Sequence, residues 1–312
     1  MTMNHSSDGS RDPLVPVNRA HPPTRTFPPP TNAQSEMERL RNVSRAETNI
    51  SNNILKMYGT ERSVARLAAA PISQSLVLKG GYLLREVLPA GVRRTTLDAD
   101  FYSTNDRKEE VIAAITEALT KPHDQDHCAF HRDSMEVNPI QGEEGIRITY
   151  KGSLGVGSID GMIDIGFTAA VIPSPERREL RPMLRHATPF HVLAYPIAVV
   201  AAEKYETILS RGLLNTRLKD YYDLSCLARY HRESPEILRP ALEATCTQRG
   251  TLLATTRPPG LMAEYTQNPQ MQKAWRSMTT KGSGEQGLTL EQASEDIWAM
   301  FAEVVDPSSG SR

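Results

Sequence analysis

The chain has 312 residues, enough for one large domain or two of ordinary size. Its 36 lysines and arginines nearly balance its 37 aspartates and glutamates, so the overall charge gives no sign of a nucleic-acid partner, although a local basic face is compatible with it. Three widely spaced cysteines predict a reduced, cytoplasmic protein, and no run approaches the roughly 20 apolar residues that cross a bilayer, so no membrane association is expected.

The first 35 residues are rich in proline, serine and asparagine and predict a disordered tail, because they offer little apolar surface to bury. Residues 306–312 predict a second disordered tail for the same reason. From residue 35 to about residue 70, apolar side chains recur at intervals of three or four, as Met37 and Leu40 do, which is typical of helix.

The next elements alternate between short strands and helices. Residues 75–79 predict a buried strand that enters a double glycine, and residues 82–87 predict a short helix. Residues 97–102 predict a second strand and 107–119 an amphipathic helix. Alternating residues at 145–150 and 158–167 flank a glycine-rich turn and predict a hairpin, in which Asp164 lies on the face opposite Ile163 and Ile165.

The prolines of residues 172–176 interrupt the pattern and predict the end of the first domain. After residues 191–195 the chain predicts helices at 196–211, 216–230, 233–246 and 290–305. We therefore expect an α/β (α+β) protein with a mixed-sheet catalytic domain over residues 36–175 and an α-helical C-terminal domain over residues 176–305.

Three acids on predicted strands form the first candidate cluster. Asp98 and Asp100 are two residues apart, so a strand would point both carboxylates to one face, and Asp164 on a neighbouring strand would complete the group. Carboxylates together with substrate phosphates are the usual ligands of Mg²⁺, and two such ions can promote an in-line displacement. The alternative is that the aspartates are ordinary turn residues, but the preceding Gly80 and Gly81 favour a phosphate site.

A second candidate cluster lies on the predicted C-terminal helices. Lys204 would reach a phosphate from the first of them, and Asp220 and Asp223 share one face of the next because they are three residues apart. Lys219, one position before Asp220, points elsewhere. The alternative is a solvated charged helix face.

The order of these motifs resembles the AbiEii-type nucleotidyltransferase toxins, which include MenT-like proteins, over residues 36–232. The resemblance is carried by Lys79-Gly80-Gly81, Arg94-x-Thr96-x-Asp98-x-Asp100, Ile163-Asp164-Ile165, Tyr195-Pro196 with Glu203-Lys204, and Arg217-x-Lys219-Asp220-x-x-Asp223. It implies a polymerase-β-like mixed sheet with flanking helices, followed by a helical domain. It also implies a toxin of a toxin–antitoxin or phage abortive-infection system that transfers nucleotides from an NTP to an acceptor such as the tRNA 3′ end.

The same resemblance implies roles for individual residues. Asp98, Asp100 and Asp164 would bind Mg²⁺, or Mn²⁺ in its place, and Asp164 would also activate the acceptor hydroxyl. Asp220, oriented by Lys219 or Arg217, would complete the catalytic group, and Lys204 would hold a phosphate. The implied nucleotide contacts are Lys79, Gly80, Gly81, Arg94, Thr96, Lys204, Arg211, Arg217, Lys219 and Asp223. The implied partners are the NTP, an acceptor RNA and a cognate antitoxin.

One departure leaves the acceptor open: many relatives carry Gly-Asp where this chain has Thr168-Ala169. Nucleotide transfer to a small molecule or a partner protein remains an alternative, as does a non-catalytic, NTP-binding regulatory protein. A lesser signal is the set His123, His127, Cys128 and His131, whose spacing would suit zinc on a helix, although the acids and proline around it favour a polar loop.

Overall fold

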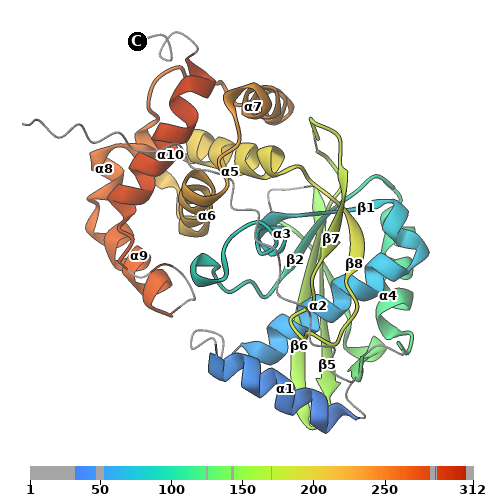
Figure 1. Ribbon diagram of the computed structural model, residues 1–312. Helices are drawn as coiled ribbons and strands as arrows, with labels where there is room; N and C mark the ends of the chain where they lie inside the picture. The colour runs from blue at the N-terminus through green and yellow to red at the C-terminus, as the bar shows by residue number, and fades with distance from the viewer. Residues whose placement is uncertain are drawn as a thin grey trace, which may run out of the picture.

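The computed structural model describes residues 32–46, 53–123, 126–141, 144–169, 171–281, 285 and 287–306 (Figure 1). Its centre is one mixed sheet of eight strands in the order β3-β5-β6-β2-β1-β8-β7, with β4 paired to β5. The strands are β1 (Leu76–Lys79), β2 (Ala99–Ser103), β3 (Cys128–Phe130), β4 (Glu136–Pro139), β5 (Gly145–Leu154), β6 (Gly157–Gly166), β7 (Glu176–Leu180) and β8 (Phe190–Ala194).

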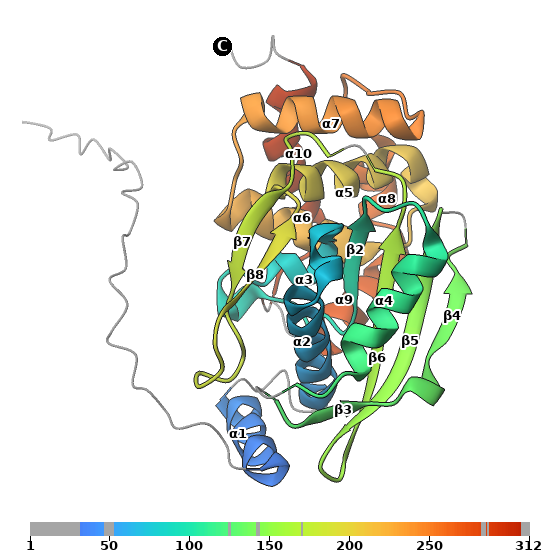
Figure 2. The same cartoon turned by 90° about the vertical axis from the view of Figure 1, so that its right-hand side faces the viewer.

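Helices of the N-terminal half flank this sheet: α1 (Ala33–Ala46), α2 (Ile54–Ala69), α3 (Gly80–Leu84) and α4 (Lys108–Thr120). Figure 2 shows α2 and α4 lying across one face of the sheet. Gly59 of α2 meets β6 so closely that an added Cβ would overlap the side chain of Ile159. The inward residues Ile159, Ile163 and Ile165 are fully buried, so β6 and the helices share one core.

The C-terminal half is helical: α5 (Ile197–Arg211), α6 (Leu218–Tyr230), α7 (Pro235–Arg249), α8 (Ala263–Thr266), α9 (Pro269–Lys281) and α10 (Leu290–Val305). These helices gather at one end of the sheet (Figures 1 and 2). Aromatic pairs join them, with Tyr205 stacked on Phe301 at 3.9 Å between ring centroids and Tyr221 on Tyr265 at 5.1 Å. Helix α5 is buried over most of its surface, as expected for a helix that is apolar nearly all round.

The predicted fold class is confirmed: a mixed α/β sheet with flanking helices precedes a group of helices. The hairpin is confirmed as β5 and β6, and helices α5, α6, α7 and α10 begin and end close to their predicted limits, whereas α8 and α9 were not predicted. The single helical pattern of residues 35–70 belongs to two helices, α1 and α2, and residues 47–52 between them lie outside the described ranges.

The expected division at residue 175 cuts through the sheet, because β8 pairs in parallel with β1 and β7 pairs with β8. Most of both predicted tails, residues 1–31 and 307–312, lies outside the described ranges, and α1 already begins at Ala33. The histidine set does not lie on one helix: Cys128 opens strand β3, and residues 124 and 125 lie outside the described ranges. No helix of the described part is both apolar enough and long enough to span a bilayer.

Candidate active site

A row of four charged residues crosses the sheet at the end that faces the C-terminal helices. In the strand register Lys79 is opposite Asp100, Asp100 is opposite Asp164, and Asp164 is opposite Arg147. Residues opposite one another on neighbouring strands point to the same face. Asp98 lies just before β2 and is close enough to Asp100 to raise the pKa of its carboxyl. The strands therefore bring three carboxylates together between two cations.

A cavity of about 540 Å³ lies over this row, between the sheet and helices α5 and α6. Eleven of the predicted residues line it: Lys79, Gly80, Gly81, Arg94, Asp98, Asp100, Asp164, Lys204, Arg217, Lys219 and Asp220. Thus residues far apart in the sequence, from β1 to α6, share a single concave surface.

Gly80 and Gly81 begin α3 where the chain leaves β1. Gly80 has a φ of 70°, a left-handed conformation that glycine adopts without strain. A Cβ on Gly80 would overlap the Asp100 carboxylate, and a Cβ on Gly81 would overlap the Arg94 guanidinium. The double glycine is therefore needed here for the close approach of the backbone to these two side chains.

The surroundings of the Asp100 carboxyl disfavour its negatively charged form. Burial, and then the neighbouring Asp98, raise its pKa to about 7, while Lys79 lowers it. A divalent cation between Asp98 and Asp100 would offset both effects, and a pair of carboxylates is a donor set that suits Mg²⁺ bound to substrate phosphates. These two residues fit the implied metal.

Asp164 is placed beside Asp100 but is already paired. Arg147 donates from Nε to one Asp164 oxygen at 2.8 Å and from Nη2 to the other at 2.7 Å. Such a bidentate pair uses both carboxylate oxygens. Each oxygen keeps a second lone pair, so Asp164 can still take part in a metal site with Asp98 and Asp100, or accept a further hydrogen bond, while Arg147 holds it.

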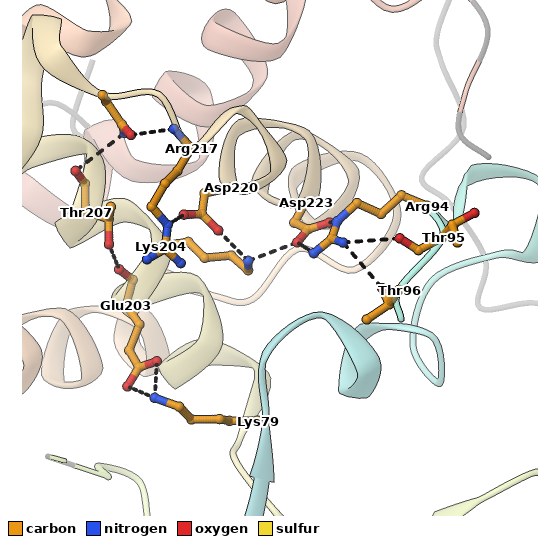
Figure 3. Close-up of polar contacts among 11 residues, drawn as sticks. Lys79, Arg94, Thr95, Thr96, Glu203, Lys204, Thr207, Arg217, Asp220 and Asp223 are labelled. Atoms are coloured by element: carbon orange, nitrogen blue, oxygen red, sulfur yellow. Dashed lines mark hydrogen bonds and ion pairs between the residues drawn. The ribbon is translucent and has the colours of Figure 1, made fainter. Parts of the chain in front are cut away.

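Lys204 lies at the centre of a buried ion network (Figure 3). Its Nζ is 2.7 Å from Asp220 Oδ1 and 2.9 Å from Asp223 Oδ2, and the residue is 8% exposed. Burial alone would lower the pKa of Lys204, but Asp220 and Asp223 raise it, so the ammonium stays charged. An ammonium has three N–H donors, which leaves one for a further acceptor in the cavity.

The network continues to the loop that precedes β2. Arg94 donates from Nε to Asp223 Oδ1 at 2.7 Å and from Nη2 to Oδ2 at 2.8 Å, and its Nη1 is 3.3 Å from Thr96 Oγ1 (Figure 3). Although burial would raise the pKa of Asp223, Arg94 and Lys204 together lower it to about 2. Asp223 and Thr96 are therefore buried supports of the cavity wall.

The other predicted cations occupy different positions. Arg217 donates to Asp220 Oδ2 at 2.7 Å, so Arg217 is the neighbour that orients Asp220, whereas Lys219 is exposed at the cavity. Arg211 is exposed at the end of α5 and is outside the described lining, and Arg93 lines another cavity.

Several lining residues were missed by the sequence analysis. Glu203 binds Lys79 at 3.1 Å, and Arg249 from the end of α7 lies 3.6 Å from the same carboxylate. Arg147 was missed because its partner depends on the register of the hairpin. A signal existed for Glu203, which directly precedes Lys204, but none marks Arg249.

The chain was compared with families and with known proteins. A family model described as "Nucleotidyl transferase AbiEii toxin, Type IV TA system" matches residues 62–302. No curated protein matches the chain. Among solved structures, JHP933 from Helicobacter pylori is 14% identical, with 81% of this chain and 93% of that chain covered and a TM-score of 0.49. A candidate nucleotidyltransferase from H. pylori is also 14% identical, with 81% and 95% covered and the same TM-score of 0.49.

The family match spans more than half of the chain and includes both clusters that line the cavity. The chain belongs to the AbiEii nucleotidyltransferase toxin family of type IV toxin–antitoxin systems.

Proposed function

We propose that this protein is a Mg²⁺-dependent toxin that transfers a nucleoside monophosphate from an NTP to a hydroxyl of an RNA, with the tRNA 3′ end as the acceptor. The acceptor hydroxyl gives its proton to the Asp164 carboxylate, a bond forms between the acceptor oxygen and the α-phosphorus, the bond from the α-phosphorus to the bridging oxygen breaks, and pyrophosphate leaves. One observation carries the proposal: Asp98 and Asp100 face a cavity that is also lined by Lys79, Arg217 and Lys219.

The size and charge of the cavity support a nucleotide. A volume of about 540 Å³ is within the range of pockets that enclose small molecules. The cations that line the cavity with the carboxylates suit a triphosphate, whose charge they would offset as pyrophosphate leaves. Lys79 lines the cavity from β1 and Lys219 from α6, and the third donor of Lys204 would bind a phosphate oxygen.

Mg²⁺, or Mn²⁺ in its place, would polarise the phosphate oxygens when bound between Asp98 and Asp100. The protein residues would then act by position. Gly80 keeps Asp100 directed into the cavity, and Arg217 keeps Asp220 beside Lys204. Asp164, held by Arg147, would accept the hydrogen bond of the incoming hydroxyl and orient its oxygen.

The type IV toxin–antitoxin family supports a cognate antitoxin as a functional partner. We place the reaction in the cytoplasm, where the proposed RNA acceptor is found.

The test is a transfer assay with each labelled NTP, Mg²⁺ or Mn²⁺, and total RNA. Label should pass from at least one NTP to RNA, and Asp98→Asn and Asp100→Asn should each reduce the rate by about a hundredfold or more. Asp160→Asn is the matched control, because Asp160 is an exposed aspartate on β6 that pairs with Lys56 outside the cavity. Absence of transfer with every NTP, or equal transfer by Asp98→Asn, would contradict the proposal.

The same assay separates the alternatives. Label in a protein or a small molecule, with none in RNA, would identify a different acceptor for the same chemistry. Binding of an NTP by calorimetry without release of pyrophosphate would identify a non-catalytic regulatory protein.

A further inference from the structure

A second cavity, of about 430 Å³, is lined by four arginines. Arg85 follows α3, Arg93 lies in the loop before β2, and Arg178 and Arg181 come from β7 and the residue after it. Two acids, Glu86 and Glu179, also line this cavity, which we name the arginine cavity. Glu176 outside the lining pairs with Arg178, so four arginines against three glutamates leave one positive charge, and burial, the largest influence, raises the pKa of the Glu86 carboxyl.

Two guanidinium nitrogens of the arginine cavity are buried without a hydrogen-bond partner in the described part of the chain: Arg85 Nη1 and Arg178 Nε. Arg85 lies over the ring of Tyr82, and Arg178 donates to Glu176 through Nη2. A buried N–H without an acceptor is costly, so native proteins rarely retain one without a ligand or water to bind it. Protein atoms cover both nitrogens, so an acceptor in the cavity would reach them only after the guanidinium groups turn toward it, and the positive charge of the arginines would favour an anionic acceptor.

Guanidinium groups bind phosphate through paired N–H donors in a fixed fork. Arginines on an edge strand such as β7 have an alternative role: their charge can prevent the strand from pairing with another sheet. That role needs exposed charges and would not bury Arg178 Nε without an acceptor. Arg177, the exposed neighbour of Arg178 on the same strand, fulfils it, because adjacent strand residues point to opposite faces.

The arginine cavity is next to the candidate active site along the chain at two places. Gly80 and Gly81 line the active-site cavity at the start of α3, and Arg85 lines the arginine cavity at its end, roughly 7 Å away at 1.5 Å of helix per residue. Arg94 lines the first cavity and Arg93, one residue earlier, lines the second. Neighbouring residues of the chain therefore line the two cavities.

We infer that the arginine cavity binds a backbone phosphate of the acceptor RNA and so positions its reactive end. This inference rests on the proposed function, since it assumes that the acceptor is RNA. Arg85 and Arg178 would each donate to the phosphate oxygens, and the two remaining arginines would add positive charge around them.

The experiment measures binding of total tRNA to the full chain at several salt concentrations, in EDTA and without NTP, so that no turnover contributes. Arg85→Gln and Arg178→Gln should each weaken binding about tenfold or more, and the slope of log affinity against log salt should fall by about one. Arg177→Gln removes the same charge from the opposite face of β7 and should change affinity much less. Arg178→Lys should keep most of the salt slope but lose affinity, because it keeps the charge and loses the fork.

Equal affinity and slope for wild type, Arg178→Gln and Arg177→Gln would overturn the inference, provided thermal unfolding shows that each variant is folded. A calorimetric titration with inorganic phosphate gives the second arm. If wild type binds phosphate and Arg178→Gln does not, while both bind tRNA equally, the cavity is a site for a small phosphate compound. That result would overturn the inference of an RNA ligand. If the protein does not bind tRNA but transfers a nucleotide to another acceptor, this inference is overturned. The proposed nucleotidyltransferase activity would still stand.

Discussion

At the scale of single residues, Asp100 combines burial with a neighbouring acid. Its pKa of about 7 in the metal-free protein is above the ordinary value of 3.8. At pH values between these two, the folded state keeps a proton on Asp100 that the unfolded state has lost. Folding stability should therefore fall as pH rises from about 4 to about 7 and should then level off. The contribution of Asp223 has the opposite sign: its pKa of about 2 gives stability that is lost only below about pH 4.

The substitution Asp100→Asn keeps the shape of a protonated carboxyl at every pH. We expect the variant to be more stable than wild type at pH 8 and similar to it near pH 4. Urea unfolding of both proteins in EDTA at several pH values measures the difference. A difference that does not change with pH would show that Asp100 does not titrate in this range.

Gly80 is the residue whose replacement should disturb Asp100 most directly. Gly80→Ala would place a methyl group on the carboxylate at a φ of 70° and should destabilise the fold by about 1–3 kcal/mol. It should also remove nucleotide transfer, since Asp100 must move. Gly91→Ala is the control, because a Cβ there meets no atom of the described residues within 4 Å. Equal stability and equal transfer rates for Gly80→Ala and Gly91→Ala would be evidence that the close approach of Gly80 to Asp100 is not required.

The candidate acids could be predicted because their spacing on strands is a local property. Asp98 and Asp100 are two residues apart, and the alternation around Asp164 sets its face. The pairing of Arg147 with Asp164 depends on the length of the hairpin turn. The structure has a two-residue turn, Gly155 and Val156, with a φ of 57° at Gly155, whereas the glycines of residues 151–157 allow several registers.

At the scale of elements, the Arg94–Asp223 pair joins the loop before β2 to α6, and Lys204 joins α6 to α5. Buried charges in one network depend on one another, because removal of a partner leaves the other uncompensated. The connection between sheet and helices should therefore be measurable as a coupling energy.

A double-mutant cycle with Arg94→Gln and Asp223→Asn tests this connection. We expect a coupling of about 1–3 kcal/mol from urea unfolding, since Asp223 is 2% exposed and held by two bonds from Arg94. The exposed pair Arg107–Glu110 is the control and should show almost none. A coupling for Arg94 and Asp223 as small as that of the control would mean that the two elements are held together by other contacts.

Most elements that were predicted have a strong apolar pattern, although α9, with Met271, Trp275 and Met278 at helical spacing, was missed. The hairpin strands and helices α5, α6 and α10 carry buried residues at regular intervals. Strand β4 is exposed at every position, and edge strand β7 buries Leu180 alone, so neither has an alternating apolar pattern. Their pairing is determined by neighbouring strands, which local sequence does not specify.

At the scale of the whole molecule, sheet and helices depend on each other. Strand β8 completes the sheet beside β1 after a long excursion through β5, β6 and β7, and α5 follows it directly into the helical group. The cavity takes Asp98 and Asp100 from the sheet and Lys204 and Asp220 from the helices. The site therefore requires both halves of the chain.

Truncation tests this dependence. A fragment of residues 1–175 lacks β8 and would expose the edge of β1, where Val77 and Leu78 are buried in the full chain. We expect the fragment to aggregate or to unfold without cooperativity, as measured by size-exclusion chromatography and circular dichroism. A monomer with a cooperative unfolding transition would show instead that the first 175 residues form an independent domain.

The central claim is that Asp98 and Asp100 hold a divalent cation against the phosphates of an NTP, next to Lys204. Anomalous scattering from crystals grown with Mn²⁺ and a non-hydrolysable NTP analogue tests it directly. We expect a Mn²⁺ peak within coordination distance of both carboxylates, with the triphosphate between Lys79 and Lys219. A triphosphate bound elsewhere, such as in the arginine cavity, with no Mn²⁺ at the two aspartates, would contradict it.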